Sequence, residues 1–352
     1  MSEDRSKRRV EALRQVAAVA LSNASWLVPE LLPTGKLRNG RYWALNPNRG
    51  DRSLGSFYVT METGWWCDRA SGDRGGDIVA LAAFVWGVKQ LEAAEQLASR
   101  LNLSVFDEPS KGLSEDSRKK QAARVEQAML DAELKRNKAE LERVEGAQKA
   151  RQYARKLWSS SLPASANHPY LVRKGVSPAG ARQKGDMLLL PVYRKGELIN
   201  LQRIFPDGTK VFLRHGEVMG GYIPIGKPEY GETLYICEGW ATGKSVSDFF
   251  AGATVVCAMN TENMLAVTDF LVERFGGVID LVIARDDDRK SKVIIDGETV
   301  DNPGRAFAER SANKHQLRVI SPLWPSEAPA ELSDFNDLAV WLNENSQPKF
   351  LV

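Results

Sequence analysis

Hydrophobic and polar positions along the chain of 352 residues change their spacing several times, and each change predicts a different element. Residues 8–30 carry apolar side chains at helical spacing, so we expect a helix there. Residues 41–68 have short aromatic and β-branched runs between turn residues, which predicts short strands. Asp77 is a good N-cap before an apolar run that ends at Trp86, so a helix should pack on this small sheet, and another should follow at 91–101.

A long charged segment comes next. FDEPSKGLSED has the composition of a linker. Residues 114–160 are rich in Glu, Lys, Arg and Ala and contain no proline; Gly146 is the one residue in them that strongly disfavours a helix. Because the apolar positions are sparse and the charges alternate, we expect a solvated helix that spaces two domains. A DNA-binding helix is the alternative.

Strand patterns dominate the second half of the chain. Residues 188–213, LLLPVYRKGELINLQRIFPDGTKVFL, predict strands joined by tight Lys-Gly and Asp-Gly turns. After Gly231, the apolar runs TLYICEG, ATVVCAM, IDLVIARDDD and QLRVISP alternate with amphipathic helices, which predicts a parallel sheet covered on both faces. The fold class is therefore α/β, with a parallel-sheet domain behind a mixed, basic, β-rich subdomain.

Composition and charge limit the class of protein. With 43% apolar and 26% charged residues and no apolar run near the roughly 20 residues that span a bilayer, we expect no membrane association. The start, MSEDRSKRRV, lacks the apolar stretch of a signal peptide, so we expect a cytoplasmic protein. A net charge of +3 argues against a globally basic nucleic-acid binder and leaves local basic patches possible.

The cysteines and histidines do not predict a zinc site. The three cysteines form no CxxC pair, and those at 237 and 257 lie in strand-like runs, where a buried reduced thiol is expected. The three histidines, at 168, 215 and 315, are widely scattered. Any metal ion should therefore be a hard cation bound by carboxylates.

The stretch YICEGWATGKSV poses the central question about chemistry. It contains Gly-Lys-Ser behind an apolar run, like a P-loop. A P-loop needs four residues between its glycines, however, whereas Gly239 and Gly243 are separated by three. The residue before Gly239 is Glu238, whose charge would repel a triphosphate. The alternative is that Glu238 itself is functional, at the end of a buried strand.

Two predicted parallel strands end in acidic residues. Glu238 follows one, and Asp286, Asp287 and Asp288 follow another. Because a strand has period 2, Asp286 and Asp288 should point the same way and Asp287 the opposite way. Ligands bind at the carboxyl ends of such strands, and oxygen ligands favour Mg²⁺ or Mn²⁺. The alternative is that these acids only cap the following helices.

A second acidic pair, Asp334 and Asp337 in SDFNDL, follows the last predicted strand. Each of these residues is either a further metal ligand or an ordinary helix cap.

These motifs carry a family resemblance. YICEG and VIARDDD resemble the two motifs of the TOPRIM domain of bacterial-type primases, topoisomerases and some nucleases, and SDFNDLAVW resembles the acidic segment that closes this domain in plasmid and phage primases. HPYLVRKGV, the segment 188–213 and GYIPIG resemble the basic subdomain before TOPRIM in those primases. Residues 46–84 are similar in layout to their zinc-ribbon domain. The resemblance covers most of the chain except residues 114–160.

The chain departs from the family pattern at two points. The N-terminal domain retains only Cys67 of the Cys/His ligands, so it would have to fold without zinc. Cellular primases place an acid four residues after the first glutamate, where this chain has Thr242. Four parts follow from the resemblance: a zinc-ribbon-like template-binding domain (1–105), a linker with the charged helix (106–160), the basic subdomain (161–230) and the TOPRIM catalytic domain (231–352).

The resemblance implies a DNA primase, a nucleotidyltransferase that makes short RNA primers on single-stranded DNA for phage or plasmid replication. Glu238, Asp286 and Asp288 would be catalytic and would hold Mg²⁺ or Mn²⁺, with Asp334 and Asp337 as further candidate ligands. Basic residues of the second half would contact ribonucleoside triphosphates or template: Arg194, Lys195, Arg203, Lys210 and Lys244. In the first domain the template contacts would be Arg49, Arg52, Trp65 and Arg74, because single-strand binding surfaces mix aromatic and basic side chains.

Other readings of the same residues remain open. Arg194 and Lys195 also fit an ordinary solvated turn, and only one of Trp65 and Trp66 should be exposed, since the small core needs the other. A TOPRIM nuclease would use the same carboxylates. A protein with a vestigial site would act as a nucleic-acid-binding adaptor in replication or defence. As a primase, the protein would work with a separate replicative helicase.

Overall fold

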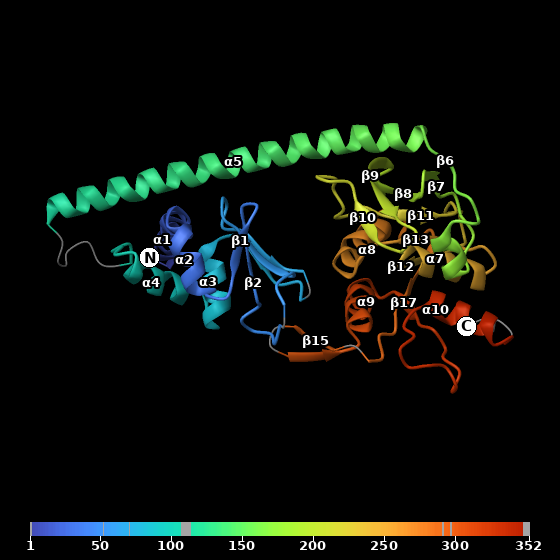
Figure 1. Ribbon diagram of the computed structural model, residues 1–352. Helices are drawn as coiled ribbons and strands as arrows, with labels where there is room; N and C mark the ends of the chain where they lie inside the picture. Colours follow the sequence, from blue (N-terminus) through green and yellow to red (C-terminus); the bar gives the residue numbers. More distant parts are fainter. Residues whose placement is uncertain are drawn as a thin grey trace. The chain divides into compact units, whose positions relative to one another are not determined.

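A computed structural model describes residues 2–51, 53–69, 71–106, 114–290, 292–295 and 298–347. The chain divides into two compact units, Met1–Glu142 and Arg143–Val352, which are described separately below (Figure 1). None of the helices in the described ranges combines the length and the apolar character needed to cross a membrane.

The N-terminal unit pairs a cluster of helices with an antiparallel sheet. Its helices are α1 (Ser2–Ser22), α2 (Ala24–Leu31), α3 (Ile78–Trp86) and α4 (Gln90–Arg100). Its strands, in sheet order, are β1 (Lys36–Arg38), β2 (Arg41–Ala44), β3 (Phe57–Thr60), β4 (Trp66–Asp68) and β5 (Arg74–Gly75). The helix expected at 8–30 is thus two helices that meet at Asn23.

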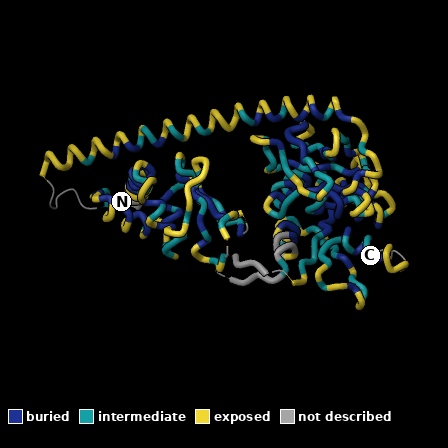
Figure 2. The backbone as a smooth tube through the Cα atoms, viewed as in Figure 1, coloured by how far each residue is buried: buried dark blue, intermediate teal, exposed yellow. Residues whose placement is uncertain are grey.

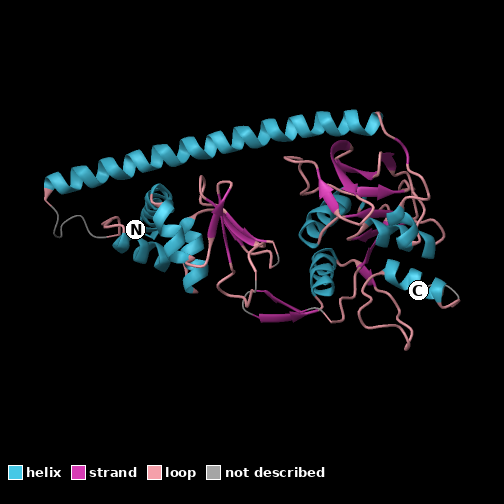
Figure 3. Ribbon diagram, in the orientation of Figure 1, coloured by secondary structure: helices cyan, strands magenta, loops and turns pink. Residues whose placement is uncertain are grey.

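One face of this sheet forms the core of the unit. Tyr42, Phe57, Val59 and Trp66 are buried together with apolar side chains of the helices, and Figure 3 shows the helices gathered beside the sheet. Asp77 caps α3 as expected, because its side chain accepts a hydrogen bond from the backbone N–H three residues on (2.9 Å). Alternation along the strands leaves the other face of the sheet free of this core.

The charged segment forms a single helix, α5 (Glu115–Ser159), which passes from one unit into the other. Small apolar side chains of its first half, Val125, Ala128 and Ala132, join the core of the N-terminal unit. Ala154 and Leu157 join a core of the second unit. Figure 2 shows buried and exposed positions alternating along the helix. The expected solvated spacer is therefore anchored at both ends.

The second unit contains an antiparallel sheet formed by residues before the predicted TOPRIM segment. Its strands, in sheet order, are β10 (Lys210–Phe212), β9 (Glu197–Ile204), β8 (Met187–Arg194), β7 (Arg182–Lys184) and β6 (Leu162–Pro163). A short helix, α6 (Pro169–Lys174), precedes β7. The β8–β9 hairpin turns at Lys195 and Gly196, which both have positive φ, as a two-residue hairpin turn requires.

A mixed sheet of order β11-β13-β12-β14-β17 completes the second unit. Its strands are β11 (Ile223–Ile225), β12 (Thr233–Cys237), β13 (Thr254–Cys257), β14 (Asp280–Ala284) and β17 (Arg318–Ile320). Its helices are α7 (Trp240–Phe249), α8 (Thr261–Phe275), α9 (Pro303–His315) and α10 (Phe335–Glu344). A separate hairpin, β15 (Lys292–Ile295) and β16 (Glu298–Asp301), follows β14.

The predicted α/β class is confirmed, and four neighbouring strands, β13, β12, β14 and β17, are parallel. β11 runs antiparallel at one edge, so this sheet includes a strand that lies before the expected start at residue 231. Apolar side chains of both faces are buried in two separate clusters, one with α7 and α10 and the other with α8 and α9. This layering brings the carboxyl ends of β12 and β14 side by side.

Candidate functional site

The turn after β12 is a strand-to-helix connection. Gly239 is the N-cap of α7, so Gly243 and Lys244 lie within the helix. A Cβ atom on Gly243 would lie 2.6 Å from Sγ of Cys257 and 2.9 Å from Sγ of Cys237, so glycine allows the helix to pack directly on the sheet. Lys244 forms an ion pair with Asp248, one turn further along the helix. The segment is therefore not a P-loop.

The acidic residues after β14 alternate as expected. Asp287 points to one side, where it accepts hydrogen bonds from Asn302 (2.8 Å) and Trp324 (3.0 Å) and pairs with Arg285 (3.1 Å). Burial acts to raise the pKa of Asp287, but these bonds hold it below its usual range. Asp286 points away from this network. Asp287 is therefore held by hydrogen bonds and an ion pair within the fold.

Glu238 and Asp286 lie in each other's electric field at the adjacent ends of β12 and β14. Burial raises the pKa of Asp286 well above its usual range, and Glu238, Asp334 and Asp288 raise it further. Burial also raises the pKa of Glu238. A hydrogen bond from the hydroxyl of Thr261 (2.9 Å) lowers it, but the effect of burial is larger. The structure thus brings the three predicted catalytic carboxylates into one neighbourhood, where their charges are mutually unfavourable.

The second acidic pair forms the start of α10. Asp334 is its N-cap: Oδ1 accepts from the backbone N–H of Asp337 (2.7 Å), and Oδ2 accepts from the hydroxyl of Thr242 (2.9 Å). Asp337 accepts from the backbone N–H of Ser333 (3.1 Å) and pairs with Lys174 (3.5 Å). Both carboxylates are helix caps, and both also raise the pKa of Asp286. Their expected role as ligands remains a prediction.

The chemistry of the carboxylates suits a hard divalent cation, but among the described residues their spacing does not form a complete metal site. Within the described part of the chain, Oδ1 of Asp286 is buried and has no hydrogen-bond partner. Such an atom is costly unless something compensates it, and carboxylate oxygens are the ligands that Mg²⁺ and Mn²⁺ take. Among the residues that the structure describes, no three acidic, histidine or cysteine side chains stand close enough together to hold a metal ion as they are.

Lys210 is the predicted basic residue that faces the carboxylates. It pairs with Ile204 across β10 and β9, and Ile204 belongs to the core shared with α7 and α10. Partial loss of water lowers the pKa of the Lys210 ammonium group, and nearby Lys174 lowers it further. Asp334, Glu238 and Asp286 act in the opposite direction. Lys210 therefore lies in the electric field of the acidic group.

A buried tyrosine adjoins this group. Tyr170 is 2% exposed, and in the described ranges its hydroxyl has no hydrogen-bond partner. Burial raises its pKa to about 12, and Asp334 contributes in the same direction. The charged ends of Lys210 and Arg173 lie 5.9 and 5.8 Å from the centre of its ring. A buried hydroxyl without a partner, beside carboxylates and cations, is available to a ligand.

The other basic candidates of this unit have different surroundings. Arg203 pairs with Leu189 and Val211, so it lies on the face of the antiparallel sheet opposite to Lys210, and it donates to the Phe212 carbonyl (3.2 Å). Arg194 pairs with Glu217 (2.9 Å), and Lys195 lies in the hairpin turn. Their predicted contacts with nucleotide or template remain predictions that these local contacts do not support.

The N-terminal unit has an aromatic and basic face on its sheet. Cross-strand neighbours form a row on the side away from the core, which we call the platform: Lys36, Trp43, Tyr58, Cys67 and Arg74. The guanidinium groups of Arg41 and Arg69 lie 4.6 and 5.4 Å from the centre of the Tyr58 ring. Trp65 is 38% exposed and lies 5.8 Å from the same ring.

The predicted template residues of this unit separate into two groups. Arg74 and Trp65 belong to or adjoin the platform, and Trp66 is buried, so one tryptophan of the pair is exposed as expected. Arg49 lies inside the unit, paired with Asp51 (2.6 Å), and its role in template binding remains a prediction that this contact does not support. Arg52 lies outside the described residues.

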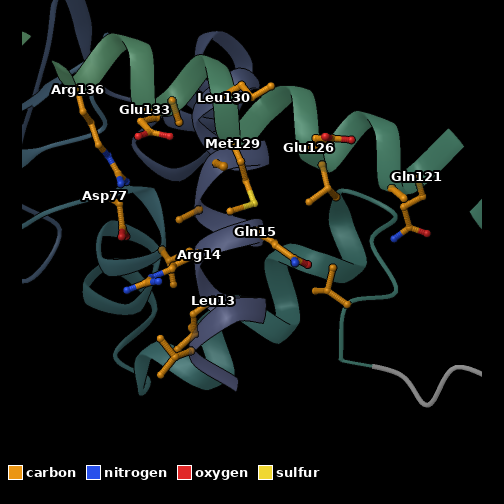
Figure 4. Close-up of a pocket in the computed structure, with 18 of the residues that line it drawn as sticks. Leu13, Arg14, Gln15, Asp77, Gln121, Glu126, Met129, Leu130, Glu133 and Arg136 are labelled. Atoms are coloured by element: carbon orange, nitrogen blue, oxygen red, sulfur yellow. The ribbon is translucent and has the colours of Figure 1, made fainter. Parts of the chain in front are cut away.

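A cavity of about 1130 Å³ lies between α1 and the first half of α5. Figure 4 shows Leu13 and Met129 directed into it, with the charged side chains of Arg14, Glu133 and Arg136 around them. None of the catalytic or metal-binding candidates lines this cavity. It therefore does not belong to the acidic site.

Sequence reasoning missed the supporting residues of the site. Tyr170 and Lys174 lie in HPYLVRKGV, a segment noted only for its resemblance. Thr261 follows β13, the strand beside β12, so the rule that ligands bind at the carboxyl ends of parallel strands could have indicated it. Thr242 stands where the family has an acid, and its partner, Asp334, comes from a distant part of the chain.

Comparison with known proteins identifies part of the chain. Residues 233–341, from the start of β12 into α10, match the family model described as the Toprim domain. These residues therefore form a Toprim domain, and the resemblance of the acidic motifs is confirmed.

Three solved structures are similar at low identity. The primase fragment of the bacteriophage T7 primase-helicase protein is 16% identical, with a TM-score of 0.35, over 50% of this chain and 70% of that chain. The Aquifex aeolicus primase, with zinc-binding and RNA polymerase domains, is 14% identical, with a TM-score of 0.34, over 96% and 83%.

The third is a bacteriophage T7 lagging-strand DNA polymerase with primase domains bound to an RNA/DNA hybrid and dTTP, which is 13% identical with a TM-score of 0.33, over 50% and 87%. TM-scores of this size do not establish a shared fold, so the Toprim match carries the assignment.

Proposed function

We propose that this protein is a DNA primase, which synthesises short RNA primers on single-stranded DNA by Mg²⁺-dependent nucleotidyl transfer. The observation that carries the proposal is the group of acidic residues at the ends of β12 and β14 inside a Toprim domain. Glu238 and Asp286 are both partly buried and both have a raised pKa, so the protein itself does not compensate the charge that these carboxylates carry when ionised. A divalent cation with a triphosphate would provide that neutralisation.

Glu238, Asp286 and Asp288 would hold the cation, with Asp334 and Asp337, which act electrostatically on Asp286, as further candidate ligands. Bound Mg²⁺ or Mn²⁺ would activate the 3′ hydroxyl of one ribonucleotide and neutralise charge as pyrophosphate leaves the next. Lys210 would contact the phosphates, because its ammonium group lies in the electric field of the carboxylates. The buried Tyr170 hydroxyl would donate a hydrogen bond to the nucleotide.

Template binding would fall to the platform of the N-terminal unit. Bases stack on aromatic rings while arginine side chains follow the phosphates. Trp43 and Trp65 offer the rings, and Arg41, Arg69 and Arg74 offer the charges. The protein would act in the cytoplasm during phage or plasmid replication, and a separate helicase would unwind the duplex.

The test is incubation of the full chain with single-stranded template, labelled ribonucleotides and Mg²⁺. We expect short labelled oligomers whose synthesis stops when Mg²⁺ is removed. Shortened template would instead indicate a nuclease, and binding without either product would indicate an adaptor; both results would overturn the proposal.

A matched pair of variants ties the activity to the site. Asp286→Asn should lose primer synthesis, because it removes a carboxylate from the acidic group while keeping the shape of the side chain. Asp280→Asn is the control, since Asp280 begins the same strand and pairs at the surface with Arg318. Loss of activity in both variants, or in neither, would contradict the assigned role.

A further inference from the structure

Four polar residues of the N-terminal unit have the spacing of zinc ligands. Two residues separate Asn46 from Arg49, eighteen (50–67) separate Arg49 from Asp68, and two separate Asp68 from Ser71. Paired ligands with two residues between them, separated by about 15 to 20 residues, are typical of a zinc site on two loops. Here, none of the four positions carries a cysteine or a histidine.

The fold brings three of these residues together. Asn46 donates to Oδ2 of Asp68 (2.6 Å), and a guanidinium nitrogen of Arg49 lies 3.3 Å from the same oxygen. Asp68 is fully buried, and Asn46 is 3% exposed. The loop between β2 and β3 is thereby fastened to the end of β4, which is the task of a structural metal ion in a small domain.

Arg49 supplies the positive charge of this cluster. Its Nε pairs with Asp51 (2.6 Å), and another nitrogen donates to the hydroxyl of Ser56 (2.9 Å). The hydrogen bond to Asp51 raises the pKa of Arg49, and Asp68 and Asp73 raise it further, against the effect of burial. One guanidinium group is therefore surrounded by carboxylates, as a cation is by its ligands.

The fourth residue closes the second loop. The hydroxyl of Ser71 donates to Asp73 (2.6 Å), whose carbonyl oxygen accepts from the backbone N–H of Asp68 (2.7 Å). Ser71 is 8% exposed. Each loop is therefore closed by its own polar contacts, and the contacts of Asn46 and Arg49 with Asp68 join the two loops.

These residues do not fit zinc. Guanidinium has no lone pair to donate, and the carboxylate of Asp68 is already occupied by Asn46 and Arg49. Cys67 belongs to the platform, whereas its neighbours Trp66 and Asp68 are buried on the other side of β4. The cysteine of this unit therefore points away from the four positions.

We propose that Asn46, Arg49, Asp51, Asp68 and Ser71, the guanidinium cluster, replace a structural metal ion, so that the N-terminal unit folds without metal. The guanidinium group of Arg49 provides the charge, and Asp68 provides the link between the loops. This proposal concerns folding and does not depend on primer synthesis.

The first test is metal analysis of the full chain purified from zinc-supplemented cells. We expect far less than one zinc per chain, and hydrogen exchange of residues 41–75 that is unchanged by a zinc chelator. The proposal would be overturned if the chain contained one zinc ion per molecule and if removing that zinc with a chelator accelerated hydrogen exchange in residues 41–75.

The second test removes the cation. Arg49→Leu should accelerate hydrogen exchange of residues 41–75 by roughly a hundredfold or more, because it leaves buried carboxylate charge uncompensated. Arg41→Leu is the control, since that guanidinium lies over Tyr58 on the platform. Equal exchange in the two variants would contradict the role of Arg49.

The third test restores a metal site. Asn46→Cys, Arg49→His, Asp68→Cys and Ser71→Cys, combined in a Cys67→Ser background, should bind one Co²⁺ per chain with the absorption of a tetrahedral thiolate complex. Its stability should then depend on metal, unlike that of the parent. A variant that neither binds cobalt nor folds in its presence would contradict the equivalence of the four positions.

Discussion

The two units of this protein each gather acidic side chains, and they treat the charge in opposite ways. In the guanidinium cluster, Asp51 and Asp68 surround Arg49. Burial acts to raise the pKa of Asp51, but hydrogen bonds from Arg49 and the backbone of Asn46 hold it below its usual range. At the ends of β12 and β14, Glu238 and Asp286 face other carboxylates, and their pKa values are raised. The first group is neutralised from within the chain, and the second is not.

We expect this difference to separate structural acids from functional ones. A carboxylate with a built-in cation stabilises the fold and has no capacity left for a ligand. A buried carboxylate that repels its neighbours costs free energy when it is ionised, and a bound proton or a bound cation relieves that cost. The same contrast occurs within one turn, since Asp287 is satisfied by three donors whereas Oδ1 of its neighbour Asp286 is buried without a partner in the described structure.

Removing one carboxylate from each group should change stability in opposite directions. Asp68→Asn should lower the free energy of unfolding of the N-terminal unit by about 3 kcal/mol or more, because it breaks a buried pair. Asp286→Asn should raise that of the second unit when no divalent cation is present, because it relieves repulsion. Urea unfolding followed by hydrogen exchange separates the two units. A loss of stability in both variants would break the comparison.

The pH dependence should follow the raised pKa values. In the native state Glu238 and Asp286 hold protons more tightly than in the unfolded chain. Without divalent cations, stability of the second unit should therefore fall as pH rises from the ordinary carboxyl range through the raised pKa values. The slope should be smaller in Asp286→Asn. An unchanged slope would show that this carboxyl group does not titrate differently on folding.

Lys210 lies in the electric field of the acidic site, and its removal should impair nucleotide use. Lys210→Gln should lower kcat/KM for ribonucleotides on the order of tenfold to a hundredfold, the value of a charge-assisted contact with phosphate. Lys195→Gln, in the hairpin turn, is the control. Steady-state primer synthesis measures both. A similar loss of kcat/KM in the two variants would contradict a specific contact of Lys210, because any loss of positive charge would then have the same effect.

The position of Glu238 depends on the close packing of α7 against the sheet. Gly243→Ala places a methyl group 2.6 Å from Sγ of Cys257 and should cost about 1 to 3 kcal/mol of unfolding free energy. Cys257→Ala in the same chain should recover part of this loss by making room. A double-mutant cycle in urea measures the coupling. Additive effects would contradict the proposed contact.

The platform should contribute a smaller, distributed effect. Trp65→Ala should weaken binding of single-stranded DNA by about 1 kcal/mol, near the lower end of the value of one stacked base, because the ring is only partly exposed. Fluorescence anisotropy at several salt concentrations measures it. Trp26→Ala is the control, since Trp26 is similarly exposed on α2. Equal weakening in both would argue against stacking on the platform.

The sequence was enough to predict the acidic site because parallel strands align their carboxyl ends. Glu238 and Asp286 lie 48 positions apart in the chain, yet the alternation of strands and helices implies that they meet. The opposite directions of Asp286 and Asp287 followed from the period of a strand. The same period places Lys210 and Arg203 on opposite faces of the antiparallel sheet. This follows only from the pairing register of β9 and β10, which the sequence does not give.

Other features depend on contacts that no local pattern encodes. Asp334 is tied to Thr242, 92 positions away, and Tyr170 reaches the site from a short helix in another part of the unit. The sequence predicts Arg49 as a template contact, because single-strand binding surfaces mix aromatic and basic side chains. Its actual partners, Asp51 and Asp68, become visible only when the β2–β3 loop folds back on β4.

The most direct test is the unfolding temperature of the second unit during titration with Mg²⁺, in the wild-type chain, Asp286→Asn and Asp280→Asn. We predict that Mg²⁺ raises the unfolding temperature of the wild-type chain and of Asp280→Asn, and that Asp286→Asn starts higher and does not respond. An equal response to Mg²⁺ in Asp286→Asn, or no response in the wild-type chain, would contradict the assignment of the acidic group as a metal site.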